Sequence, residues 1–167
     1  MILAGENATG TMTGFVHLHV HSYYSLLDGC PSPADLAQAA AQAGMPALAL
    51  TDHNALYGAI EFYDACREAG VRPIVGMELT IDVGTSSPDV LVLLACDLAG
   101  YANLCRLSSA LQTRPDREAA LLTGLPIGEL EGRTNNLIAL SGGKRGRLGR
   151  LLRAGRDRDA GATAAAW

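Results

Sequence analysis

Strand-type and helix-type patterns alternate along the first half of the chain. Short apolar runs at 15–20, 47–51 and 71–81 predict three strands, and the segments 33–43 and 59–69 between them predict two helices. Ser32 before Pro33 is typical of a helix start, and Gly44 and Gly70 are typical of helix ends. Because the connections are short and each contains a helix, we expect a parallel sheet and an α/β fold.

The second half continues the alternation less regularly. The runs 90–95 and 136–141 predict two more strands, and helices are expected at 101–111, near 117–122 and from about 147 onward. Residues 82–89 read as a turn-rich link. The length of 167 residues, 49% of them hydrophobic, suits one domain. We expect this domain to cover 14–167 and residues 1–13 to form a disordered leader.

Charge is distributed unevenly along the chain. Residues 1–143 carry 15 acidic and 6 basic side chains, whereas 144–167 carry 7 basic and 2 acidic ones. An acidic body suits a site that gathers cations and is unlike a stand-alone DNA clamp. We interpret the basic segment as a solvated helix face, with phosphate contact as the alternative. The sequence shows no secretory signal and no apolar run long enough to cross a membrane, and four unpatterned cysteines indicate a cytoplasmic protein.

Three of the four histidines stand at alternate positions in the first predicted strand. His17, His19 and His21 would share one face of an extended segment, and Asp28 follows in the next loop. Imidazole is the commonest protein ligand for zinc and similar ions. The pattern therefore predicts half of a metal site, with a histidine-rich edge strand as the alternative.

Further candidate ligands follow the next two strands. Asp52 and His53 come after 47–51, and Glu78 lies at the end of the third strand. The carboxyl ends of parallel strands converge on one face, so these side chains are expected to meet those of the first loop. Each residue has another interpretation on its own: Asp52 as a turn cap, His53 as an ordinary polar residue, Glu78 as a surface carboxylate. His17 lies deeper along its strand and is expected to support the ligands rather than to bind.

The motifs identify a family. The segments HLHVHSYYSLLDG, MPALALTDHNALYGAIEFY and RPIVGMEL, with LVLLACDLAGYANLCRLSS downstream, resemble the polymerase-and-histidinol-phosphatase (PHP) domain. The likeness covers residues 14–155 and is closest to the version at the N-terminus of bacterial C-family DNA polymerases, the DNA polymerase III alpha subunits and their error-prone relatives.

The resemblance implies a fold and a metal cluster. PHP domains are distorted TIM-like (β/α)7 barrels that hold divalent zinc, manganese or iron and hydrolyse phosphate esters; in the polymerases the site can act as a 3′–5′ exonuclease. Carried over by motif, the expected metal ligands are His19, His21, Asp28, His53 and Glu78. Asp52 and His17 are expected to support them, and no catalytic acid or base is assigned.

The sequence also departs from the family pattern. Val90 stands where a histidine is frequent, Gly143 stands where many polymerase members have a cysteine, and the last D-x-H motif would lie beyond residue 167. We therefore expect a barrel truncated at its C-terminus, with about five strands, and a weakly active or structural site.

The resemblance further implies the setting in which this domain works. The parent protein would be a DNA-directed DNA polymerase, a nucleotidyltransferase of replication or translesion synthesis. Its expected partners are DNA, reached through the parent polymerase, and other replication subunits, with no membrane. The alternatives are a purely structural module and a free-standing phosphatase that acts on a small phosphate monoester.

Overall fold

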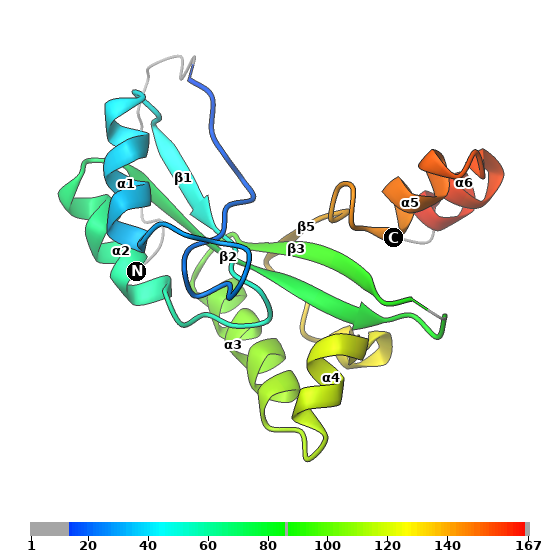
Figure 1. Ribbon diagram of the computed structural model, residues 1–167. Helices are drawn as coiled ribbons and strands as arrows, with labels where there is room; N and C mark the ends of the chain where they lie inside the picture. The colour runs from blue at the N-terminus through cyan, green and yellow to red at the C-terminus, as the bar shows by residue number, and fades with distance from the viewer. Residues whose placement is uncertain (1–13, 86, 166–167) are drawn as a thin grey trace.

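The computed structural model describes residues 14–85 and 87–165, so the expected leader at 1–13 lies outside the described residues. The elements follow one another as α1 (Pro33–Gln42), β1 (Ala47–Leu50), α2 (Ala59–Glu68), β2 (Arg72–Asp82), β3 (Asp89–Ala95), α3 (Leu98–Gln112), α4 (Arg117–Thr123), β4 (Leu125–Pro126), the 3-10 helix η1 (Ile127–Leu130), β5 (Leu137–Leu140), α5 (Arg147–Arg153) and α6 (Asp157–Ala165). Helices and strands are therefore mixed, as an α/β fold requires (Figure 1).

One sheet runs through the molecule in the order β1-β2-β3-β5, and β4 pairs with the outer part of β2. The β1–β2 ladder is parallel, as predicted, and places Ala47 beside Arg72. The β2–β3 and β3–β5 ladders are antiparallel. The link 83–88 is too short for the crossover that a parallel β3 would need, so β2 and β3 form a hairpin. Among the described strands, β1 and β5 end this path and no ladder joins them.

The predicted strand at 15–20 is wrong. These residues form no strand in the described structure. Two backbone–backbone hydrogen bonds hold them beside β1 and the residue after it, from Ala49 N–H to the His17 carbonyl and from Thr51 N–H to the Val20 carbonyl. A strand paired with β1 would need a regular ladder of hydrogen bonds. The segment 15–20 instead bends away from β1 and carries its histidines toward β2. The fifth strand of the sheet is instead the short β4.

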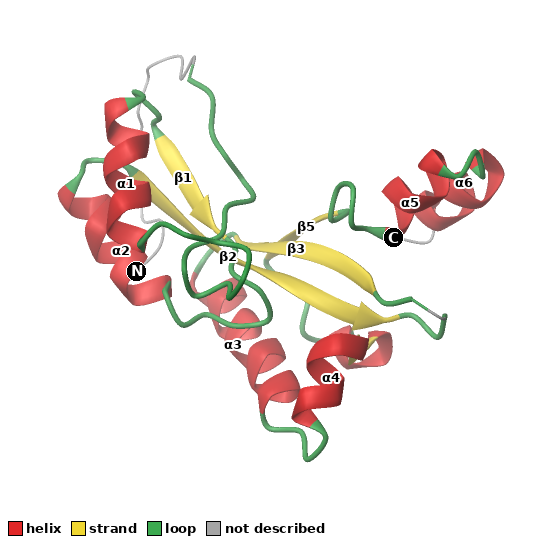
Figure 2. Cartoon of the chain, viewed as in Figure 1, coloured by secondary structure: helices red, strands yellow, loops and turns green. Residues whose placement is uncertain are grey.

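Two pairs of helices pack on the same face of the sheet, over different strands. α1 and α2 lie beside β1, and Phe62 and Cys66 of α2 pack there with Leu48 and Leu50 (Figure 2). α3 and α4 cover the β2–β3 hairpin, where Leu104 and Leu107 meet alternate residues of β2. These β2 residues are Val75, Met77, Leu79 and Ile81. Because side chains alternate along a strand, Glu78 projects from the opposite face of β2.

The C-terminal helices α5 and α6 pack against each other and lie beyond β5, away from α1 and α2 (Figure 1). The loop between β5 and α5 returns across β3 at Gly142. This residue has φ 66°, and a Cβ there would stand 2.2 Å from the Val90 carbonyl oxygen, so only glycine fits the approach. Among residues 14–85 and 87–165, no helix is both long and apolar enough to cross a membrane.

Candidate metal centre

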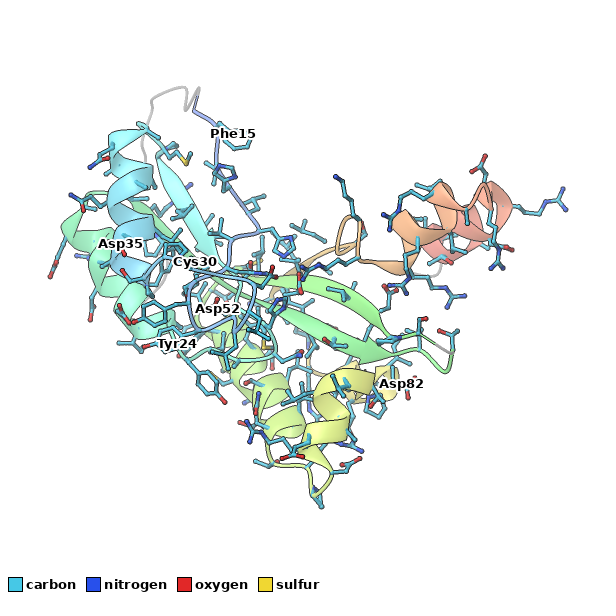
Figure 3. The ribbon with its side chains drawn as sticks, in the orientation of Figure 1. Phe15, Tyr24, Cys30, Asp35, Asp52 and Asp82 are labelled. Atoms are coloured by element: carbon cyan, nitrogen blue, oxygen red, sulfur yellow. The ribbon has the colours of Figure 1, made fainter. Side chains whose placement is uncertain are left out.

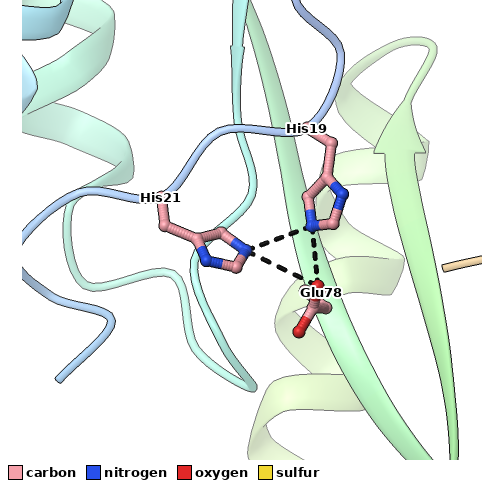
Figure 4. A group of neighbouring side chains, drawn as sticks. All are labelled: His19, His21 and Glu78. Atoms are coloured by element: carbon pink, nitrogen blue, oxygen red, sulfur yellow. Dashed lines mark hydrogen bonds and ion pairs between the residues drawn. The ribbon is translucent and has the colours of Figure 1, made fainter. Parts of the chain in front are cut away.

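Glu78 is the centre of the cluster. It is buried on β2, and its two carboxylate oxygens face different histidines. Oε2 lies 2.6 Å from His19 Nε2 and 3.6 Å from His21 Nε2 (Figure 4), whereas Oε1 lies 2.6 Å from His53 Nδ1. Glu78 is therefore not the surface carboxylate that the sequence alone also allowed.

Backbone pairing explains why His53 meets Glu78. An isolated parallel bridge joins the two residues just beyond the end of β1. The Glu78 N–H donates to the Asp52 carbonyl at 3.1 Å, and the Asn54 N–H donates to the Glu78 carbonyl at 2.8 Å. The loop after β1 is therefore held in register with β2. Glu78 lies inside β2, which continues to Asp82, and not at the strand end where the sequence placed it.

His19 and His21 reach the cluster through Thr51. Its hydroxyl donates to the Val20 carbonyl at 3.1 Å and accepts the Val20 N–H at 2.9 Å, so the peptide between the two histidines is fixed to the end of β1. The two rings turn toward each other, with Nε2 atoms 3.1 Å apart (Figure 4). At this distance at most one of the two Nε2 atoms can carry a proton, because two N–H groups pointing at each other would collide.

Asp28 joins the cluster from a loop. Its Oδ2 lies 2.9 Å from His21 Nδ1 and 2.8 Å from His53 Nε2. Gly29 closes this loop, since a Cβ there would stand 2.0 Å from the Ser22 carbonyl oxygen. The Nδ1–H of His21 donates to Asp28, and its Nε2 faces His19 and Glu78. A carboxylate behind a histidine in this way fixes the ring and its tautomer for metal binding.

Asp52 lies behind the cluster rather than in it. Its buried carboxylate accepts the Ser22 N–H at 2.7 Å, the Ser22 hydroxyl at 2.7 Å and the Ser25 hydroxyl at 2.6 Å. Ser25 Oγ in turn accepts the His53 N–H at 3.1 Å. Asp52 (labelled in Figure 3) thus connects the loop that carries Asp28 with the loop that carries His53. The role expected for Asp52, to support the metal ligands, stays a prediction, and these hydrogen bonds are consistent with it.

His17 lies apart from the other candidates. Its ring is exposed and makes an edge contact with Phe15, with ring centroids 4.7 Å apart. Its recorded bond to β1 comes from the backbone carbonyl, not from the imidazole. The supporting role expected for the side chain stays a prediction.

Sequence reasoning missed Arg145 and the two serines. Arg145, in the loop after β5, donates Nη1 to Asp28 Oδ2 at 2.9 Å and Nη2 to Asp28 Oδ1 at 3.2 Å. The basic composition of 144–158 could have pointed to Arg145. It could not have named Asp28 as the partner, because the two residues are 117 positions apart in the sequence. Ser22 and Ser25 gave no signal beyond ordinary loop composition.

The charges of the cluster shift its pKa values. Burial alone would raise the pKa of Glu78, but hydrogen bonds from His19, His21 and His53 outweigh it and hold that pKa well below its usual range. The Arg145 guanidinium, followed by His53, lowers the pKa of Asp28. The bond to Glu78 raises the pKa of His53, against the opposing effect of burial.

Two groups of three ligand atoms fit a cation. His19, His21 and Glu78 form the first, the Glu78 half, and His21, Asp28 and His53 form the second, the Asp28 half. The atoms of the Glu78 half lie 2.6–3.6 Å apart. A tetrahedral shell with bonds of about 2.0–2.1 Å separates its ligands by about 3.3–3.4 Å, so the His19–Glu78 pair, now at hydrogen-bond distance, would have to open to admit an ion. Two imidazole nitrogens and a carboxylate oxygen are ligands that zinc and similar ions accept. The histidine and carboxylate cluster also opens onto a cleft of about 620 Å³.

The comparisons with known proteins agree on one family. The model of the PHP domain matches residues 17–167. The chain is 45% identical over 169 residues to the error-prone DNA polymerase of Symbiobacterium thermophilum, which covers 92% of this chain and 15% of that protein. It is 40% identical over 141 residues to the DNA polymerase III subunit alpha of Escherichia coli K12, covering 83% of this chain and 12% of that subunit.

A further relative is the DNA polymerase III subunit alpha of Bacillus subtilis, 38% identical over 143 residues and covering 84% of this chain and 12% of that subunit. The chain thus spans only 12–15% of the length of these curated relatives. Among solved structures, an amidohydrolase from Chromobacterium violaceum with bound sulfate and no metal aligns with a TM-score of 0.48, at 31% identity over 58% of this chain and 33% of that one.

Proposed function

The chain belongs to the PHP domain family, and from that premise we propose that it binds divalent metal ions for phosphoester chemistry within a DNA polymerase of the C family. One observation carries the proposal. Side chains from two other segments, His19 and His21 on one and His53 on the other, meet around the buried carboxylate of Glu78, and the sequence assigned a ligand role to each. We further propose that the sheet and helices of this chain form part of a PHP-type barrel, and that this barrel is closed in the parent protein.

The ligand assignment follows the two halves. His19 and His21 bind through Nε2 and Glu78 through Oε2 in the Glu78 half, while Asp28 and His53 belong to the Asp28 half. A neutral imidazole offers one lone pair, so His21 serves one half at a time and orients itself through Asp28 when it serves the first. Zinc, manganese and iron suit this donor set, and a bound ion supplies Lewis-acid activation of water and of a phosphate ester.

The chain's own residues also limit the chemistry. Gly143 lines the cleft but has no side-chain donor, and Val90 is apolar. We therefore propose that hydrolysis of DNA 3′ ends is weak and that the domain also serves as a structural part of the polymerase. DNA and other replication subunits are proposed partners through the parent protein, in the cytoplasm. A free-standing phosphatase is not favoured, because the curated relatives described above are polymerases.

The test is metal analysis of the purified chain. The chelator-stripped protein is loaded with Mn²⁺ or Zn²⁺, dialysed, and assayed for metal per chain. We expect about one ion or more per chain, with occupancy lost in His19→Ala. An occupancy below about 0.1 ion per chain would overturn the proposal. Fast, chelator-sensitive release of nucleotides from a labelled 3′ end, abolished by His19→Ala, would overturn the assignment of weak hydrolysis.

A further inference from the structure

Arg145 holds both oxygens of Asp28. Oδ2 accepts three donors at once, from His21, His53 and Arg145, and Oδ1 accepts the second guanidinium nitrogen at 3.2 Å. A two-pronged pair of this kind gives geometric specificity as well as attraction. Each carboxylate oxygen of Asp28 therefore accepts a nitrogen of the Arg145 guanidinium.

The Glu78 half has no such occupant. The recorded ion pairs of Glu78 among the described residues are to His19, His21 and His53. Histidines can release a proton to an arriving cation, whereas a guanidinium stays charged. The two halves therefore differ in what an ion must displace: protons in the Glu78 half and a fixed positive charge in the Asp28 half.

We propose that Arg145 is a resident competitor for the second metal position, so that the chain holds one divalent ion tightly in the Glu78 half and a second only after Arg145 leaves Asp28. This inference rests on the proposed metal binding. The guanidinium takes the place of a cation beside Asp28 and keeps the carboxylate neutralised while that position holds no ion.

The exposure of Arg145 makes this competition reversible. Its side chain is 59% exposed, and that of Asp28 is 32% exposed. Exposed ion pairs are weak in water, so a divalent ion can displace the arginine at moderate concentration. Repulsion between the ion and the departing guanidinium, which remains in the same cleft, continues to weaken the second binding step.

Lys144 provides a matched control. It lines the same cleft one residue away and carries the same charge, but its recorded contact is the backbone carbonyl that accepts a hydrogen bond from Arg153. Removing Lys144 changes the net charge of the cleft without freeing Asp28. Arg145→Lys is the complementary variant, because it keeps the charge and loses the two-pronged geometry.

The experiment is a Mn²⁺ titration of the full 167-residue chain, with free Mn²⁺ counted by electron paramagnetic resonance. The wild-type chain should bind one ion tightly and a second weakly. Arg145→Ala should tighten the second step by about tenfold and leave the first within about twofold. Arg145→Lys should give an intermediate second step, and Lys144→Gln should match the wild type. Circular dichroism confirms that each variant is folded.

The outcomes separate the two proposals. If neither the wild type nor Arg145→Ala binds Mn²⁺, the proposed function fails and this inference fails with it. If the wild type binds but Arg145→Ala leaves the second step unchanged, the inference alone is overturned. An equal gain in Lys144→Gln would also overturn it, because the effect would then reflect general charge rather than the contact with Asp28.

Discussion

The two halves of the metal centre differ in how their carboxylates are anchored. Glu78 stands inside β2, and its side chain is only 3% exposed, so the sheet register decides where it points. Asp28 stands on a loop closed by Gly29 and is 32% exposed. A strand-anchored ligand is positioned by folding itself, whereas a loop-anchored ligand depends on side-chain partners, including Arg145. We expect the Glu78 half to tolerate few changes and the Asp28 half to be adjustable.

Removal of the Glu78 charge should have the largest effect, since this residue contacts three histidines. Glu78→Gln keeps the volume but loses an anionic ligand, and we expect metal affinity to fall by at least about a hundredfold. Calorimetric titration with Zn²⁺ measures the change. The matched control is Glu61→Gln, an exposed glutamate whose recorded partners are the hydroxyls of Tyr23 and Tyr24. Wild-type affinity in Glu78→Gln would show that the strand-anchored carboxylate is not the centre of the site.

Substitution of Asp52 should affect the Asp28 half more than the Glu78 half. Asp52→Asn leaves a buried amide where an oxygen accepted charge-assisted bonds from Ser22 and Ser25, at a cost of about 2 kcal/mol in the free energy of unfolding. Because those serines position the loop that carries Asp28, the second metal-binding step should weaken by about tenfold and the first by less. Urea denaturation and Mn²⁺ titration measure the two effects.

Ser25→Ala is the graded control for Asp52. It removes one of the three bonds to the carboxylate and the acceptor of the His53 N–H. Its loss of stability should be smaller than that of Asp52→Asn, about 1 kcal/mol. A stable Asp52→Asn variant with unchanged binding would contradict the supporting role proposed for Asp52.

The pH dependence of the metal-free chain should show opposite slopes from the carboxylates and from His53. The pKa of Glu78 lies below its ordinary 4.5, so its contribution to stability is present above that pH and is lost as the pH falls. The pKa of His53 lies above its ordinary 6.5, so its contribution is complete below pH 6.5 and is lost as the pH rises through the raised pKa. Stability should therefore peak between about pH 4.5 and 6.5.

Thermal denaturation in a chelator across pH 3–9 tests this peak. Saturating Mn²⁺ should move the maximum upward, because the ion binds deprotonated histidines. Glu78→Gln should flatten the acid side of the curve. A flat profile for the wild type would contradict the electrostatic picture of the cluster.

The sequence predicted the parts of this molecule that local pattern controls. The helices at 33–43 and 59–69, the β1–β2 pair and the convergence of His53 with Glu78 all follow from periodicity and from the geometry of parallel strands. The hairpin of β2 and β3 could also have been inferred, since the link 83–88 leaves no room for a crossover.

Other features depend on long-range contacts that no local pattern records. The segment 15–20 has strand-like alternation, but the Thr51 side chain and two isolated backbone bonds hold it as an irregular segment. The contact of Arg145 with Asp28 joins two loops that are 117 residues apart in the sequence. The position of such a loop is decided by packing, here by the close approach of Gly142 to Val90.

Removal of the His17 imidazole should have the smallest effect, and it separates the sequence-based role of this residue from its observed position. The His17 backbone carbonyl, not its ring, holds the segment against β1, so His17→Ala should keep metal affinity within about twofold of the wild type. His19→Ala, two residues away on the same segment, is the control that should lose the ion. If His17→Ala weakens binding tenfold in the same Zn²⁺ titration, the ring supports the ligands as the sequence predicted, and the irregular segment 15–20 must rearrange when the ion binds.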